Sequence, residues 1–236
     1  MKNKLWTTDS YKGKEIMQNQ LLKEANEFQE KLSAWRRALH QIPEIGLHLP
    51  KTVAFVKKEL EQMDIPYTVY EESSCIVALI GSGEKCFMLR SDMDALPVRE
   101  ESGEPFASEN GCMHACGHDM HTTTLLGAAK LLKSHERELK GTVKLLFQSA
   151  EETFQGAKAA VDAGVLENPR VDAAFAMHVA PNSENKKIIY GEYPMTSVYG
   201  FRVLLTGKGT HGSAPELGVD PINAGVHLYL ALQELI

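Results

Sequence analysis

Near the start of the chain, apolar residues recur at steps of three and four, which is the spacing of one face of a helix. The first series ends before Pro43, and its members are Leu21, Ala25, Phe28, Leu32, Trp35 and Leu39. The same spacing resumes after Pro50, over residues 53–63. Proline suits the first turn of a helix but not its interior, so the pattern predicts two helices in succession.

Beyond residue 66, short runs rich in β-forming residues come first, and further such runs then alternate with helical patterns. The predicted strands are Tyr67–Tyr70, Cys75–Ile80, Cys86–Leu89, Val143–Phe147 and Ala173–Met177. The predicted helices among them are Thr122–Leu132 and Ala157–Ala163. Parallel neighbours need crossover connections, so this alternation predicts an α/β fold with a mostly parallel sheet and helices on both faces.

A polar stretch over Pro181–Lys187 interrupts this pattern, and we place a domain boundary close to Tyr190. Residues 1–190 are then the first domain, and residues 191–236 belong to a second.

The second domain is expected to begin with a strand at Tyr199–Thr206, followed by a glycine-rich turn and a helix that opens near Asp220–Pro221. That helix continues to Ile236 without a capping glycine, so we expect the domain to be incomplete and the chain to be truncated.

Composition narrows the class of protein. The chain has 236 residues, 43% of them hydrophobic, and a net charge of −6, which favours a folded protein and gives no reason to bind nucleic acid or anionic lipid. The four cysteines are too few for a disulfide framework and no secretory leader is recognisable, so we expect a cytoplasmic protein. No apolar run approaches the roughly 20 residues that a membrane-spanning helix needs.

Polar side chains follow three of the predicted strands. Asp92 and Asp94 come after the third strand, Glu151 and Glu152 after the fourth, and His178 after the fifth. Ligands and catalytic groups collect beyond the carboxyl ends of parallel strands, so these side chains are expected to converge.

The densest cluster of potential metal ligands is the segment CMHACGHDMH at residues 112–121. Gly117 permits a tight turn, so that Cys116 and His118 can face one ion. We interpret His114 and His121 as local structure, because helical spacing from His118 makes them neighbours without making them ligands. Thiolate with imidazole favours zinc, whereas carboxylates favour harder ions such as manganese, and cobalt also fits.

The adjacent Glu151 and Glu152 suggest a division of roles: one side chain binds metal while the other takes a proton from the water that the metal activates. Two ions in one site are compatible with the bridging ability of thiolate and carboxylate, and hydrolysis is the expected reaction class. No HExxH, GxSxG or phosphate-loop pattern is present to support a rival assignment.

The sequence resembles the metal-dependent aminoacylase-type amidohydrolases, the group of hippurate hydrolases, N-acetyl-diaminopimelate deacetylases and plant auxin-conjugate hydrolases, within the metallopeptidase superfamily of acetylornithine deacetylase. Six motifs in family order carry the resemblance: RRALHQIPEIGLH at 36–48, LRSDMDALPV at 89–98, MHACGHDMHT at 113–122, AEET at 150–153, AMHV at 176–179 and GKGTHGSAP at 207–215.

The resemblance implies a catalytic domain with an inserted α+β lid or dimerisation domain, a homodimer formed through that lid, and hydrolysis of N-acyl amino acids. It implies two divalent ions per site, manganese or zinc, with cobalt or nickel as further options. The implied metal ligands are Cys116, His118, Glu152 and His178. Glu151 would be the general base, Asp94 would orient a ligand, and His211 of the lid would hold the substrate carbonyl or its oxyanion.

Two features depart from the family pattern. Family members continue past residue 236 into a returning catalytic segment with a further metal-binding histidine, and they commonly carry histidine where this chain has Glu216. The alternative function is therefore an inactive, truncated fragment that binds metal or a partner chain.

Overall fold

The computed structural model describes residues 19–184, 187–190 and 200–235. The chain divides into two units, Met1–Asn182 and Ser183–Ile236. The assignment of residues 1–190 to a catalytic domain and of residues 191–236 to a lid stays a prediction.

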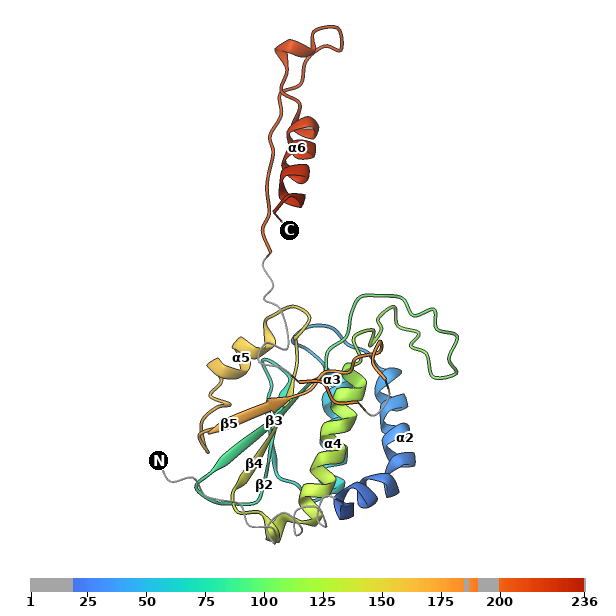
Figure 1. Cartoon of the computed structure of the whole chain (residues 1–236), viewed down its shortest axis with the longest axis vertical. Helices are drawn as coiled ribbons and strands as arrows, with labels where there is room; N and C mark the ends of the chain where they lie inside the picture. The colour runs from blue at the N-terminus through green and yellow to red at the C-terminus, as the bar shows by residue number, and fades with distance from the viewer. Residues whose placement is uncertain (1–18, 185–186, 191–199, 236) are drawn as a thin grey trace. The chain divides into compact units, whose positions relative to one another are not determined.

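The first unit is built on a mixed five-stranded sheet with the strand order β1-β2-β4-β3-β5 (Figure 1). The strands are β1 Tyr67–Tyr70, β2 Cys75–Ile80, β3 Cys86–Asp92, β4 Thr142–Gln148 and β5 Ala173–Ala176. The predicted parallel arrangement is confirmed for β4, β3 and β5, but β1 and β2 are antiparallel to their neighbours. The four residues 71–74 join β1 to β2, and so short a connection can only join antiparallel strands.

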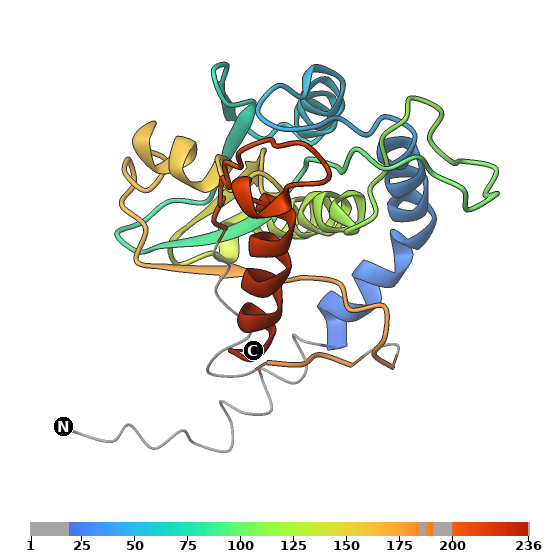
Figure 2. The same ribbon diagram turned by 90° about the horizontal axis from the view of Figure 1, so that it is seen from above.

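Helices cover both faces of this sheet, as predicted (Figures 1 and 2). They are α2 Gln29–His40, α3 Pro50–Gln62, α4 His118–Ser134 and α5 Gly156–Asp162, with a short 3-10 helix at Glu136–Glu138. The predicted first helix is interrupted at Phe28, which separates helical residues 19–27 from α2. The break lies where the Phe28 amide donates to the Ala25 carbonyl, three residues back rather than four.

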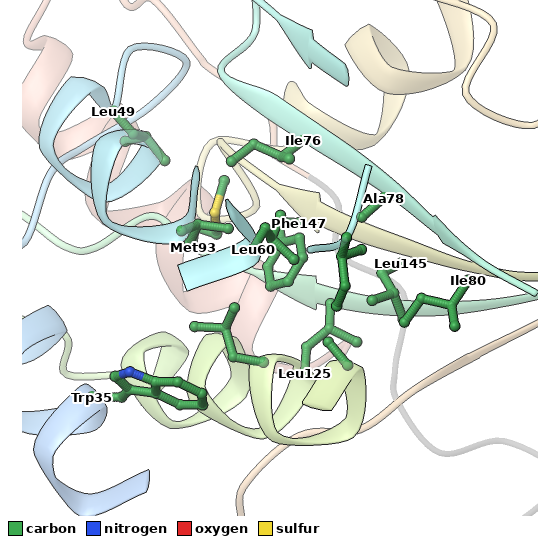
Figure 3. Close-up of a cluster of buried hydrophobic side chains, with 14 residues drawn as sticks. Trp35, Leu49, Leu60, Ile76, Ala78, Ile80, Met93, Leu125, Leu145 and Phe147 are labelled. Carbon is green, nitrogen blue, oxygen red and sulfur yellow. The ribbon is translucent and has the colours of Figure 1, made fainter. Parts of the chain in front are cut away.

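The larger apolar core lies between the sheet and helices α2, α3 and α4 (Figure 3). Trp35 of α2, Leu60 of α3 and Leu126 of α4 pack there against Ile76 and Phe147 of the sheet. Each such side chain contributes about 1.5 to 3 kcal/mol on burial. This core fixes the sheet edge and the start of α4, which carry the candidate site.

The second unit contains the 3-10 helix Pro215–Leu217 and helix α6 Pro221–Gln233. The predicted start of α6 is confirmed, because Asp220 caps it by accepting hydrogen bonds from the Ile222 and Asn223 amides at 2.8 and 3.2 Å. The strand predicted at Tyr199–Thr206 is wrong for residues 200–206, and Tyr199 lies outside the described residues.

The physical reason is the lack of a pairing partner for that segment. Within residues 200–235, the one β-contact is an isolated bridge between Lys208 and Val219, and an unpaired extended segment is not a strand. Across both units, the described residues contain no helix that is long and apolar enough to cross a membrane.

Candidate metal centre

The carboxyl ends of three parallel strands meet at one edge of the sheet. In the register, Asp92 at the end of β3 lies opposite Gln148 at the end of β4, and Arg90 lies opposite Ala176 at the end of β5. The residues that follow these ends therefore converge, as the sequence predicts.

Gly117 sets the geometry of the loop that leads into α4. Its φ of +87° lies in the left-handed region, and a Cβ at this position would lie 2.6 Å from Val179 Cγ2. Any other residue would be strained there and would clash with the segment after β5. The turn places Cys116 and His118 on either side of Gly117, where both approach His178.

His118 is the central side chain of the site. It is fully buried, and its Nδ1 donates a hydrogen bond of 2.9 Å to the Asp94 carbonyl. This bond leaves the lone pair of Nε2 free. Nε2 is buried, has no hydrogen-bond partner among the residues that the structure describes, and lies 3.7 Å from both Glu151 Oε2 and Glu152 Oε1. A ring nitrogen oriented in this way by a carbonyl is arranged as a metal ligand is.

His178 and Cys116 form a second pair of donor atoms beside His118. His178 Nδ1 donates to the Val179 carbonyl at 2.7 Å, so its Nε2 carries a lone pair, which accepts a hydrogen bond from the Cys116 thiol at 3.3 Å. Donor atoms of Cys116, His118 and His178 all lie within 4.8 Å of one another.

Asp94 holds the two glutamates in place. This fully buried carboxylate accepts hydrogen bonds from the Glu151 amide at 3.0 Å and from the Glu152 amide at 3.1 Å. The turn it stabilises contains Ala150 at a φ of +51°, which is strained for a residue with a Cβ. Such strain persists only where the surrounding contacts impose it, and here those contacts orient both glutamates.

The electrostatics of the site call for a cation. Burial, together with Glu152, Glu151 and Asp92, raises the pKa of the Cys116 thiol to about 11. Burial also raises the pKa of Glu152, with Glu151 and Asp94 adding to the effect. Burial lowers the pKa of His118, but the side-chain carboxylate of Asp94 and the negative charges of Asp92 and Glu152 outweigh it and raise the pKa overall.

A divalent ion reverses each of these penalties, because it favours thiolate, carboxylate and neutral imidazole alike. Two buried atoms that can bind a metal, His118 Nε2 and Glu152 Oε1, have no hydrogen-bond partner within the described ranges and lie 3.7 Å apart. The residues present therefore fit a metal ion.

The sequence places Asp92 among the converging strand ends without a role and indicates only local structure for His121, and the structure places both at the edge of the site. His121 Nδ1 donates to Asp92 at 2.6 Å, and His121 Nε2 accepts the Val179 amide at 3.0 Å. Asp92, His118 and His121 lie within 4.8 Å of one another, but hydrogen bonds occupy both nitrogens of His121. The role of His121 is to fix the segment beside His178, and the convergence of Asp92 with the site agrees with its predicted place at a strand end.

His114 is also buried, and neither of its ring nitrogens has a hydrogen-bond partner among the described residues. Burial lowers its pKa to about 4. His114 is therefore neutral at pH 7.

His211 and Glu216 belong to the second unit. His211 is exposed, and its Nδ1 accepts hydrogen bonds from the Ser213 hydroxyl and amide at 2.8 and 3.3 Å. Glu216 lies in the 3-10 helix Pro215–Leu217. The predicted contact of His211 with substrate stays a prediction.

Comparison with known proteins gives one matching family model, that of peptidase family M20/M25/M40, over residues 88–231. An IAA-amino acid hydrolase (ILR1-like 4) of Arabidopsis thaliana is 43% identical over 218 residues, which are 91% of this chain and 49% of the relative. The N-acetyl-L-cysteine deacetylase of Bacillus subtilis is 40% identical over 88% of this chain and 50% of its own length. The hippurate hydrolase of Campylobacter jejuni is 38% identical over 92% of this chain and 57% of its own length.

Among solved structures, a Bacillus subtilis protein described as a dinuclear metal binding peptidase of the M20 family superposes with a TM-score of 0.63 at 40% identity. That match covers 66% of this chain and 45% of the other. A chain from methicillin resistant Staphylococcus aureus superposes with a TM-score of 0.75 at 32% identity, over 91% of this chain and 58% of the other. The chain spans about half the length of the curated relatives it matches.

Proposed function

Since the chain belongs to peptidase family M20/M25/M40, we propose that the whole protein is a metal-dependent amidohydrolase that cleaves the amide bond of N-acyl amino acids. Relatives named as an IAA-amino acid hydrolase, an N-acetylcysteine deacetylase and a hippurate hydrolase support this substrate class. The products are an amino acid and a carboxylic acid.

One observation carries the proposal: in the part of the chain that the structure describes, Nε2 of His118 is buried without a hydrogen-bond partner, 3.7 Å from the carboxylates of both Glu151 and Glu152. A buried ring nitrogen that faces two acidic side chains without a hydrogen bond is costly unless a cation lies between them. We propose two divalent ions, manganese or zinc, as the native cofactor. The metal ligands would be Cys116, His118, Glu152 and His178.

A bound divalent ion supplies positive charge that polarises the amide carbonyl and lowers the pKa of water to about 7. The protein supplies the proton transfer. We assign Glu151 as the general base because its side chain is 37% exposed, whereas that of Glu152 is 17% exposed and has a buried, unpartnered oxygen. Glu151 would take a proton from the attacking water and pass it to the amine as the C–N bond breaks.

Asp94 and His211 have supporting roles in this proposal. Asp94 accepts hydrogen bonds from the backbone amides of Glu151 and Glu152, so it would fix the backbone from which both carboxylates project. His211 would hold the substrate oxyanion, and His211→Ala tests this with an expected loss in kcat. We further propose a cytoplasmic homodimer formed through the second unit, and light scattering on the whole protein checks the dimer.

The test is amino-acid release from N-acetylcysteine, hippurate and an indoleacetyl amino acid after the protein has been loaded with manganese or zinc. Glu151→Gln should retain metal and lose about 10² to 10⁴ in rate, because the amide cannot accept the proton. Glu72→Gln, an exposed change in the turn between β1 and β2, is the matched control and should leave the rate unchanged.

Equal rates for Glu151→Gln and Glu72→Gln would contradict the assignment of the base. A folded, metal-bound chain without turnover would favour the alternative of an inactive metal-binding fragment. Cys112→Ser is the control for Cys116→Ser, because Cys112 is another partly buried loop thiol. If the two variants bound the same amount of metal per chain, that result would contradict the metal site itself.

A further inference from the structure

A second cluster of charged side chains lies where α2 meets the beginning of α4. Asp119 Oδ2 accepts a hydrogen bond from His40 Nδ1 at 2.8 Å and pairs with Arg36 Nε at 2.8 Å. The other ring nitrogen of His40 donates to Glu100 Oε1 at 3.0 Å. His40 thus links a residue of α4 to a residue of the loop between β3 and α4.

The side chains of His40, Asp119 and Glu100 are buried, whereas the Arg36 side chain is 32% exposed. Burying charged side chains carries a desolvation cost. His40 is 4% exposed, and the side chains of Asp119 and Glu100 are each 1% exposed. Apolar residues of similar volume are often as stabilising as buried ion pairs. Helix α2 already packs on the core through Trp35 and Leu32, so holding the helix in place does not by itself require the cluster.

Asp119 connects the cluster to the candidate metal centre through the chain itself. It follows His118 directly in the first turn of α4, and Gly117 separates His118 from Cys116. Fixing the Asp119 carboxylate from α2 therefore limits rotation of the turn that carries His118. Figures 1 and 2 show α2 and α4 side by side, with the loop beside them.

The same cluster holds the loop that leads to Cys116. Glu100 accepts the Ser108 amide at 2.7 Å, while its other oxygen faces His40. Phe106 of this loop packs against the Arg36 guanidinium at 5.0 Å and edge-on to the His40 ring at 5.7 Å. Helix α2 thus contacts the loop at Glu100 and Phe106 and the helix start at Asp119.

We propose that His40 is a positioning residue for the metal site: by joining Asp119 to Glu100, it holds Cys116 and His118 in the geometry that binds the ion. The inference rests on the proposed function, because it takes Cys116 and His118 as ligands. Groups that hydrogen-bond a metal ligand directly typically change metal affinity or activity by about 10- to 100-fold when they are lost. His40 acts one step further away, through Asp119, so we expect an effect at the lower end of that range.

The experiment is a titration of the metal-free chain with Co²⁺, followed by the charge-transfer absorption of the Cys116 thiolate. His40→Ala should bind Co²⁺ about 10-fold more weakly and show a weaker band at saturation. His40→Gln, which can donate to one carboxylate, should recover part of the affinity. His135→Ala is the matched control, since His135 also joins two carboxylates, Glu24 at 2.7 Å and Glu138 at 2.8 Å.

A merely structural role for His40 would lower the melting temperature but leave the Co²⁺ affinity and band of the folded protein unchanged, and that result would overturn the inference. If His40→Ala does not fold, His40→Gln and Asp119→Asn replace it as the test. Wild-type Co²⁺ affinity in both of these folded variants would also overturn the inference. A wild-type chain that binds Co²⁺ no better than Cys116→Ser would instead refute the proposed metal site.

Discussion

Replacing Asp94 by asparagine should destabilise the first unit even when no metal is bound. Asp94 accepts two backbone amides, one on each carboxylate oxygen, at 3.0 and 3.1 Å. Asparagine keeps one oxygen, but its NH₂ group would face the second amide donor to donor. The substitution therefore removes one charge-assisted hydrogen bond and leaves that donor without a partner.

The expected cost follows from these two contacts. A hydrogen bond to a charged group contributes about 1.5 to 3 kcal/mol, and an unsatisfied buried donor costs about 1 to 3 kcal/mol. The two free energies are not added, because both count the loss of the same hydrogen bond. Because the two amides are only partly buried, we expect a loss of about 2 to 3 kcal/mol in the free energy of unfolding. That is a large part of the stability of a typical domain.

Urea unfolding in the presence of a chelator, followed by circular dichroism, measures this loss. Asp172→Asn is the matched control, because Asp172 also accepts a backbone amide, that of Cys86 at 2.8 Å, but is exposed to solvent. We expect a much smaller change there. If Asp94→Asn unfolded at the same urea concentration as Asp172→Asn, the role of Asp94 in holding the glutamate turn would be refuted.

Three other perturbations test separate parts of the structure. Gly117→Ala should lower Co²⁺ affinity at least tenfold (roughly 1.4 kcal/mol), because its methyl group would lie 2.6 Å from Val179 Cγ2, and an unchanged titration curve would contradict the close packing. Burial raises the pKa of Asp92 and Glu100, but their hydrogen bonds outweigh it and hold both pKa values at about 2. The stability that the two carboxylates contribute is fully present when the pH is above their ordinary pKa values of 3.8 and 4.5, and it is lost as the pH falls toward 2. Measuring the free energy of unfolding as a function of pH checks this. Lys144→Met should cost more than about 2 kcal/mol in urea unfolding, because the buried ammonium donates to three backbone carbonyls at 2.7 to 2.8 Å that would lose their partner.

Local patterns predicted most of the secondary structure of the first unit. The strands β1 and β2 have the predicted bounds, since alternating and β-branched runs between turn residues are strong local signals. The direction of β2 was missed because strand pairing is a long-range property, and β2 pairs with β4, more than sixty residues away. The four-residue turn before β2 was the local clue to an antiparallel hairpin.

The candidate site was predictable as far as strand ends and ligand types could indicate it. Glu151, Glu152 and His178 converge with His118 because β4 and β5 run parallel to β3. The links made by His40 could not be predicted, since they depend on the packing of α2 against a loop sixty residues later. The prediction of a strand at residues 200–206 is wrong for a related reason, because strand propensity alone does not supply a neighbouring strand to pair with.

The position of β4 in the sheet has a consequence for how the protein is made. β2 and β3 follow one another in the chain, yet β4 lies between them, antiparallel to one and parallel to the other. While the nascent chain leaves the ribosome, the edges of β2 and β3 that later pair with β4 stay unpaired until residue 148 has emerged. Apolar strands with open edges are prone to associate with other chains, so the translation interval between β3 and β4 is where we expect chaperones to act.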